Sequence, residues 1–361
     1  MTVVRRAMMN RIKMISAVSI AGGLLWALSA EQAAPISGQW IIDRIDVPGQ
    51  VLLTLHRSFG KSGSSTNSSG FPASSLKGLS GAQMESAEGS RVRFEIVRDA
   101  GTLACEGYFQ GGKGSGTFSF SSSPDFVGEM HRLGYNGLNP ETLFSMAAHD
   151  VSLAYVRDLR ALKLDPAWSI ALFTMRIHNV TIEYIKELLA LGYTSLKPDQ
   201  LVTMRIHGAA TDFIRELKSL GYNSVPIDEL VTMRIHGVAT DFIRELKTLG
   251  YGLVPIDELV TMRIHGVATD FIRELKTLGY GSVPIDELVT MRIHGVTTDF
   301  IKKVEALGYA HPSIDQLVTM RIHGVTPAFV KSVQKHGFTN LTMEQIIKLR
   351  QYDILPAEDH I

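Results

Sequence analysis

Histidine recurs at a fixed spacing in the C-terminal two thirds of the chain, and such a row invites the hypothesis of a metal site. The histidines lie 29 residues apart, at His149, His178, His207, His236, His265, His294 and His323. Zinc needs its nitrogen ligands at about 2 Å, whereas equivalent residues of stacked helical units are separated by about 8–10 Å. The histidines therefore cannot form a shared coordination shell by themselves, and we expect neither a metal nor another cofactor.

The position of each histidine favours two other roles. Each is the last residue of a predicted helix, where it can meet free carbonyls and the negative end of the helix dipole. Alternatively, the histidines form part of a row that contacts a partner, because on a helical wheel His236 lies with Glu229 and Thr232, opposite the apolar residues. The candidate partner-binding residues are His178, His207, His236, His265, His294, His323, Glu229 and Thr232.

An arginine series shares the 29-residue step. It includes Arg205, Arg234, Arg263, Arg292 and Arg321. The wheel places Arg234 within an apolar face formed by Ile227, Leu230, Val231, Ile235 and Val238, with Met233 at its border. An unpaired buried charge is costly, so we predict that each arginine bridges neighbouring helices, with Glu245 or Asp241 as the partner of Arg234. A row of substrate-binding arginines is the alternative.

Known catalytic motifs are absent from the sequence. It contains no HExxH, no GxSxG, no Walker loop and no GxGxxG after a predicted strand. Acidic residues do recur, but an active site is normally unique, whereas these acids appear in every unit. We therefore do not expect an enzyme.

The repeated residues belong to about eight units of two short helices each, from about residue 123 to residue 351. Residues 239–251 place Phe242, Leu246 and Leu249 on one helical face, and residues 226–236 form a second helix. N-cap residues precede the first helix in several units, at Ser123, Ser152, Thr181, Thr297 and Thr326. Helices of about 10 residues are marginal alone, so we predict an α-solenoid of 29-residue repeats over residues 122–361. The sequence does not fix its hand.

Residues 31–121 predict a small antiparallel β domain of about five strands. Val51, Leu53 and Leu55 alternate with polar residues, as expected of a half-buried strand. Residues from about 60 to 81 are rich in serine and glycine and are expected to form a mobile loop. The single cysteine, Cys105, lies in a predicted strand and is expected to be a small buried side chain.

The N-terminal 30 residues are typical of a signal peptide. Four basic residues up to Lys13 precede an apolar run over residues 14–30 that ends in small residues. An uncleaved membrane anchor is the alternative, although about 17 residues is short for a bilayer span. Either outcome predicts a periplasmic or secreted location. Cleavage removes four of the 36 basic residues and none of the 36 acidic ones, leaving 32 against 36.

Composition excludes several classes of protein. The 361 residues carry no net formal charge, so no electrostatic footprint of a nucleic-acid-binding protein is present. One cysteine excludes an intramolecular disulfide framework and a cysteine-based zinc cluster.

Two stretches resemble parts of known bacterial proteins. LVTMRIHGVATDFIRELKTLGY resembles a repeat of exported bacterial proteins, also attached to some membrane zinc metallopeptidases of the β-lactam-sensor, antirepressor type. RVRFEIVRDAGTLACEGYFQGGKGSGTFSF resembles the β segment that accompanies those repeats. This chain lacks the HExxH helix and the several membrane spans of the peptidase. The resemblance therefore implies an accessory or sensor-linked role, with no catalytic residue.

We accordingly expect a non-enzymatic extracytoplasmic binding or scaffold protein that presents its repeated helical surface to an envelope protein. It would meet a membrane only through an uncleaved N-terminal segment. The alternative is a protein that binds a small molecule or glycan through its β domain and uses the repeats as a spacer.

Overall fold

Alternating apolar and polar residues fold the first described part of the chain into one antiparallel sheet. The computed structural model describes residues 36–58, 63–164 and 169–354, so the predicted signal peptide lies outside the described residues. The strands are β1 (Ile36–Arg44), β2 (Gln50–Ser58), β3 (Ser64–Pro72), β4 (Leu76–Lys77), β5 (Ser90–Arg98), β6 (Gly101–Gln110) and β7 (Lys113–Ser122). Their order across the sheet is β3-β2-β1-β7-β6-β5-β4. A short helix, α1 (Gly81–Glu85), precedes β5.

The strand pattern seen in the sequence is confirmed in β2. Val51, Leu53 and Leu55 are buried and the residues between them are only partly buried. Trp40 of β1 is fully buried and stacks on Phe109 of β6, with ring centroids 5.6 Å apart. The sheet therefore has a genuine apolar face.

The mobile loop expected over residues 60–81 is wrong for most of its length. Strand β3 pairs with β2 along nine residues, and β4 follows within the same stretch. As an edge strand, β3 needs only its backbone to pair, so its serine side chains stay in solvent and only Phe71 is buried. The hydroxyl groups of Thr54 and Ser68 are hydrogen-bonded across the pair at 2.8 Å. The sheet consequently has seven strands instead of about five.

Pairs of short helices, one pair to each 29-residue unit, follow the sheet. The first helices of the pairs are α2 (Pro124–Arg132), α4 (Leu153–Ala161), α6 (Ile182–Ala190), α8 (Thr211–Ser219), α10 (Thr240–Thr248), α12 (Thr269–Thr277), α14 (Thr298–Glu305) and α16 (Pro327–Lys335). The second helices are α3 (Pro140–Ala148), α5 (Ser169–Ile177), α7 (Pro198–Ile206), α9 (Ile227–Ile235), α11 (Ile256–Ile264), α13 (Ile285–Ile293), α15 (Ile314–Ile322) and α17 (Met343–Gln351).

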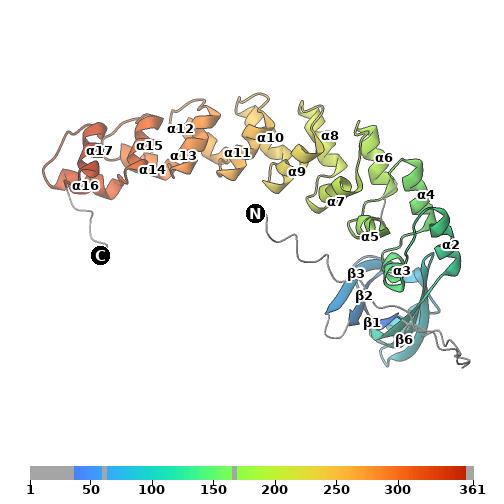
Figure 1. Cartoon of the computed structure of the whole chain (residues 1–361). Helices are drawn as coiled ribbons and strands as arrows, with labels where there is room; N and C mark the ends of the chain where they lie inside the picture. The colour runs from blue at the N-terminus through green and yellow to red at the C-terminus, as the bar shows by residue number, and fades with distance from the viewer. Residues whose placement is uncertain (1–35, 59–62, 165–168, 355–361) are drawn as a thin grey trace, which may run out of the picture.

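The helices stack in two rows, which we call the odd row (α3 to α17) and the even row (α2 to α16). Each helix packs against the preceding and following helix of its own row. The rows form a curved array that extends away from the sheet, and from α5 to α13 the odd row lies on the inner side of the curve (Figure 1). One surface of the odd row and one surface of the even row thus run along the array.

Helix ends follow the predicted capping. The five predicted N-caps are confirmed, since each side chain accepts a hydrogen bond from the backbone three residues later: Ser123, Ser152, Thr181, Thr297 and Thr326. At the other end, His236 is the C-cap of α9 and Gly237 follows with a φ of 70°. The amide of Val238 donates to the carbonyl of Met233 at 2.8 Å, which completes a Schellman motif.

The apolar face predicted for the odd helices is wrong at two positions. Met233 is fully buried instead of lying at the border, and Ile235 is 53% exposed. The two residues are about 200° apart around the helix, so they cannot both face the core. Met233 occupies the interior with Leu230, and Ile235 is turned to solvent.

Helix α3 joins the array to the sheet. Phe144 of α3 stacks on Phe118 of β7 with centroids 5.6 Å apart, and Nη2 of Arg57 donates to Glu141 at 3.1 Å. One cluster of buried residues continues from the sheet through the helices. One residue separates β7 from α2, and the division into a β domain and a repeat domain at residues 121 and 122 stays a prediction.

Within the described residues, no helix has the length and apolarity needed to span a bilayer.

Candidate partner-binding surface on the odd row

The repeated arginines lie over aromatic rings. The guanidinium of Arg234 in α9 lies 5.1 Å from the ring centroid of Phe213 in α8. Corresponding pairs are Arg176 with Tyr155, Arg205 with Tyr184, Arg263 with Phe242, Arg292 with Phe271, Arg321 with Phe300 and Arg350 with Phe329, at 5.0–5.2 Å. This distance is within the range of cation–π attraction.

The same arginines reach the preceding helix of the odd row. Nε of Arg205 donates to the carbonyl of His178 at 3.3 Å, and Nε of Arg321 does so to His294 at the same distance. Arg205 and Arg321 thus contact two neighbouring helices, as a bridge requires, whereas the buried Nε atoms of Arg234 and Arg292 have no hydrogen-bond partner among the described residues. The predicted acidic partners are wrong, however, because Glu245 pairs with Arg273 instead. The face of Phe213 contacts the Arg234 cation in place of the predicted carboxylate, and Arg205 and Arg321 gain a C-terminal carbonyl as well.

The histidines lie at the C-terminal ends of the odd helices. His207 and His265 are exposed, whereas His178, His236, His294 and His323 are partly buried. Nε2 of His323 lies 2.9 Å from Nε2 of Gln351 in the next odd helix. Gln351 is the last residue of α17, and the corresponding residue of the odd helices α5 to α15 is an isoleucine.

Exposed isoleucines recur at the last position of six successive odd helices, which the helical wheel did not predict. We call this set the isoleucine row: Ile177, Ile206, Ile235, Ile264, Ile293 and Ile322, which are 47–55% exposed. They end α5, α7, α9, α11, α13 and α15. Single exposed apolar residues are ordinary, but exposed apolar residues that recur at the same position of successive helices give a surface that can contact a partner repeatedly.

Acidic residues occupy the opposite end of the same helices. We call them the acidic rim: Asp199, Asp228, Glu229, Asp257, Glu258, Asp286, Glu287 and Asp315. All are exposed and lie in the first turn, where the helix dipole favours them. Among the described residues, none of these carboxylates has a cationic partner within 4.0 Å, as the ion pairs of the chain show.

The predicted residues Glu229 and Thr232 also lie on this surface, Glu229 in the acidic rim and Thr232 between the rim and the isoleucine row. Both are exposed, and the hydroxyl of Thr232 donates to the carbonyl of Asp228 at 2.8 Å. The structure therefore brings Glu229, Thr232 and His236 to one solvent-facing side of α9, and it adds Ile235 and Asp228 to them.

Charges on the even row are paired with one another. Oε2 of Glu245 accepts from Nη2 of Arg273 in the next even helix at 2.7 Å and also from the hydroxyl of Thr269. Arg273 in turn pairs with Asp270 of its own helix. Hydrogen bonds from Thr211 and Arg215 lower the pKa of Glu187 in the same way. The even row thus uses its charges to connect successive units.

The odd surface is retained where other positions differ between units. Phe173 of α5 stands where α9 has Val231, yet Thr174 and Ile177 keep the threonine and the isoleucine. On the even row, the position of Glu245 is taken by Lys303 in α14 and by Ser332 in α16 and is acidic in the other six units. The exposed isoleucine likewise occurs in six of the eight units, with Ala148 in α3 and Gln351 in α17 at its position. The two positions are therefore retained to the same extent within this chain.

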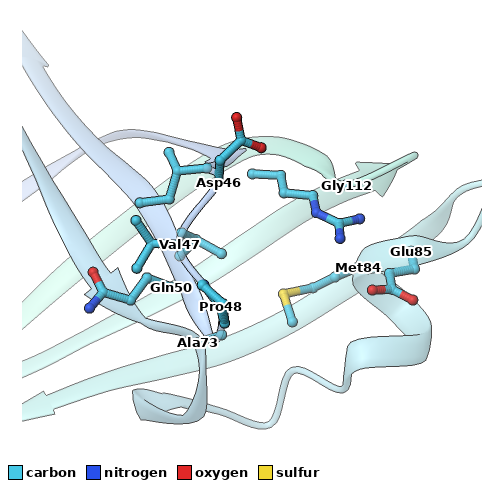
Figure 2. A pocket seen from close by; sticks show the side chains of 12 residues that line it. Asp46, Val47, Pro48, Gln50, Ala73, Met84, Glu85 and Gly112 are labelled. Atoms are coloured by element: carbon cyan, nitrogen blue, oxygen red, sulfur yellow. The ribbon is translucent and has the colours of Figure 1, made fainter.

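A hollow in the sheet region is the candidate site for the alternative function, the binding of a small molecule or glycan. It has a volume of about 470 Å³ and lies between the β1–β2 turn and α1. Figure 2 shows the side chain of Met84 pointing toward Pro48 and Ala73, with Glu85 directed away from them. The charged residues that line it, Arg44, Asp46 and Glu85, are all exposed. The hollow therefore lacks a buried polar group that would orient a small ligand.

Burial shifts the pKa values of several titratable groups. Burial raises the pKa of Cys105 to about 12, so its thiol is unreactive, and raises the pKa of Tyr184 to about 12. Burial and the nearby Arg176 lower the pKa of His149. In the part of the chain that the structure describes, no group of three or more His, Cys, Asp or Glu residues has the geometry to hold a metal ion.

No family model and no curated protein sequence matches the chain. The suspected relation to repeats of exported bacterial proteins therefore remains an expectation from the residues alone.

Proposed function

We propose that this chain is a non-enzymatic binding or scaffold protein of the bacterial cell envelope, built as an α-solenoid of 29-residue repeats. It presents the solvent-facing side of its odd row to a protein partner. The observation that carries the proposal is the isoleucine row, which leaves apolar surface in water at the same position of six successive odd helices. The export and the sensor-linked role implied by the resemblance belong to the same proposal.

The argument depends on what each row needs for its own stability. An exposed isoleucine contributes little to folding, and a helix position in water is filled as well by a polar residue. Retention of isoleucine there in units that differ elsewhere supports a role outside the fold. The recurrence also supports an extended partner, because the same contact is offered several times along one line.

The test uses full-length protein and variants that alter one surface at a time. Ile206, Ile235, Ile264 and Ile293 are replaced together by serine, and proteins that co-purify from envelope extract are compared with those of the wild type. Leu253→Ser, at a loop residue that is 59% exposed, is the control for loss of exposed apolar surface. We expect the partner to be lost from the fourfold variant and kept by the control.

The alternative function predicts a different result. If the small molecule or glycan site lies in the hollow beside α1, Met84→Asp removes binding while the fourfold isoleucine variant keeps it. That outcome contradicts a scaffold role for the odd row.

A further inference from the structure

The isoleucine row and the acidic rim lie at a constant separation on the odd row. Ile235 follows Asp228 by seven residues in α9, which corresponds to about 10 Å along the helix axis. The same two residue types recur at this separation in α7, α11, α13 and α15. The isoleucine row and the acidic rim therefore run parallel to each other along the array.

The carboxylates of the acidic rim are available to bind a cationic side chain of a partner. Whereas Asp241 and Glu245 of the even row are paired with arginines, the described part of the odd row offers no cation to Asp228 or Asp257. A hollow of about 640 Å³ lies between α13 and α15 and is lined by Asp286, Glu287 and Asp315. A second hollow, of about 580 Å³, lies where α7 adjoins α9 and includes Asp228. Lysine or arginine side chains fit such spaces between units.

The backbone of the odd row cannot bind a partner strand. Its amides and carbonyls are used within the helices and their caps, as in α9, where the threonine hydroxyl is also bonded to the turn before it. A partner segment must therefore contribute side chains and keep its own backbone satisfied by water. Polyproline II conformation meets this requirement, because its backbone is fully solvated.

The repeat distance also favours this conformation. Packed helices are separated by about 8–10 Å, and a polyproline II segment advances about 9.3 Å for each turn of three residues. Every third side chain of such a segment would face the next isoleucine. An α-helical partner repeats the same face after seven residues, or about 10.5 Å, which exceeds the helix separation.

We propose, on the basis of the proposed function, that the odd row binds an extended, positively charged segment of its protein partner. Apolar side chains of this segment recur every third residue and contact the isoleucine row, and its Lys or Arg side chains contact the acidic rim.

Two other occupants fit the surface less well. A bilayer surface rich in anionic lipids is repelled by the carboxylates of the acidic rim. A second copy of the chain brings either acidic rim against acidic rim or isoleucines against acids, because the isoleucine row and the acidic rim lie at opposite ends of the same helices.

The binding test uses a defined peptide and the full-length chain. The probe is an 18-residue peptide, (Leu-Pro-Lys)6, and the controls are (Leu-Pro-Glu)6 and a shuffled peptide of the probe's composition. Affinity is measured by calorimetry at low and high salt. We expect the probe to bind at least about tenfold more tightly than either control, and binding to weaken as salt rises.

Two sets of variants locate the binding. Replacement of Asp228, Asp257 and Asp286 by asparagine is expected to weaken binding about tenfold. The matched control replaces Asp212, Asp241 and Asp270, the acids at the same helix position in the even row, and should leave affinity unchanged. The fourfold isoleucine variant is expected to weaken binding about 100-fold or more.

Several results would overturn the proposal. Equal affinity for the lysine and glutamate peptides removes the charge argument, and equal affinity for the shuffled peptide removes the three-residue period. Binding of anionic vesicles, or an isoleucine-dependent dimer in sedimentation, assigns the surface to another occupant. The proposed function fails separately, if the fourfold isoleucine variant keeps its envelope partner while (Leu-Pro-Lys)6 no longer binds to it.

Discussion

The two rows of helices have the same length and repeat but opposite surfaces. On the even row, Arg273 pairs with Glu245 of the preceding unit, and Lys247 donates to the C-terminal carbonyl of Leu220 at 3.2 Å. On the odd row, Ile264 is 54% exposed, and Asp257 and Glu258 of the same helix have no cationic partner within 4.0 Å among the described residues. The charged groups of the even row pair with one another, whereas the exposed isoleucine and acids of the odd row remain in contact with solvent. The repeat thus connects successive units through the charges of its even row, and the odd row keeps exposed groups for the partner that we propose.

The largest effect should distinguish the core beneath the odd row from its surface. Leu259 of α11 is fully buried, so Leu259→Ala should lower the free energy of unfolding by about 2–5 kcal/mol. Ile264→Ala, in the same helix, should change it by no more than about 0.5 kcal/mol. Urea unfolding of the full chain and hydrogen exchange of α11 measure both. An equal loss in both variants would show that Ile264 packs, and the contrast between the rows would disappear.

A second pair of variants compares one arginine from each row. Arg234 is partly buried over Phe213, so Arg234→Ala should cost about 1–2 kcal/mol through lost cation–π attraction and packing of its stem. Arg273→Ala removes an ion pair whose members are about half exposed and should cost about 0.2–1 kcal/mol. Denaturation at low salt and in 1 M KCl measures both. Added salt should remove most of the Arg273 effect and little of the Arg234 effect, and the reverse order would contradict the assignment.

Two glutamates sharpen the comparison further. Glu245→Gln breaks the link to α12 and should destabilise the chain by about 0.5 kcal/mol at low salt. Glu258→Gln should cost no more than about 0.3 kcal/mol, because this acid lies in the first turn of α11 and forms no ion pair with the described residues. The measurement is the urea midpoint of each variant at two salt concentrations. A larger, salt-sensitive loss for Glu258 would reveal a partner on the odd row.

The 29-residue period and the capping residues predicted the helices. They did not predict which apolar residues of an odd helix face the core and which face solvent. The N-cap of α14 at Thr297 and the C-cap of α9 at His236 follow from local hydrogen bonding, which depends on only a few neighbouring residues. Met233 and Ile235 are both apolar and two residues apart, so the pattern could not decide which of them faces the core. The stacking of α9 between α7 and α11 decides it.

Long-range partners were the other source of error. The sequence predicts an acid as the partner of Arg234, but its guanidinium lies over the face of Phe213, which belongs to a neighbouring helix. Strand β3 was missed because its serines carry no burial pattern, and only pairing with β2 defines it. Both errors arise where a residue's neighbour in space is distant in sequence or is identified by its backbone alone.

The smallest expected effect concerns pH at the end of the odd row nearest the sheet. Burial and Arg176 lower the pKa of His149 below its usual value of 6.5. The unfolded chain therefore takes up a proton near pH 6.5, while the folded chain does so only at lower pH. Because the unfolded state binds more protons in the window just below 6.5, the free energy of unfolding must decrease as pH falls through it.

His149→Gln removes this titration and should flatten that decrease, leaving stability above pH 7 nearly unchanged. Urea midpoints between pH 5 and 7.5, combined with an NMR titration of the His149 ring, measure the change. In 1 M KCl the repulsion from Arg176 weakens but the burial persists, so the pKa should rise only in part. A wild type whose stability is constant or rises as pH falls from 6.5 would show that this histidine is not held neutral, and that even the end of the odd row against the sheet is open to water.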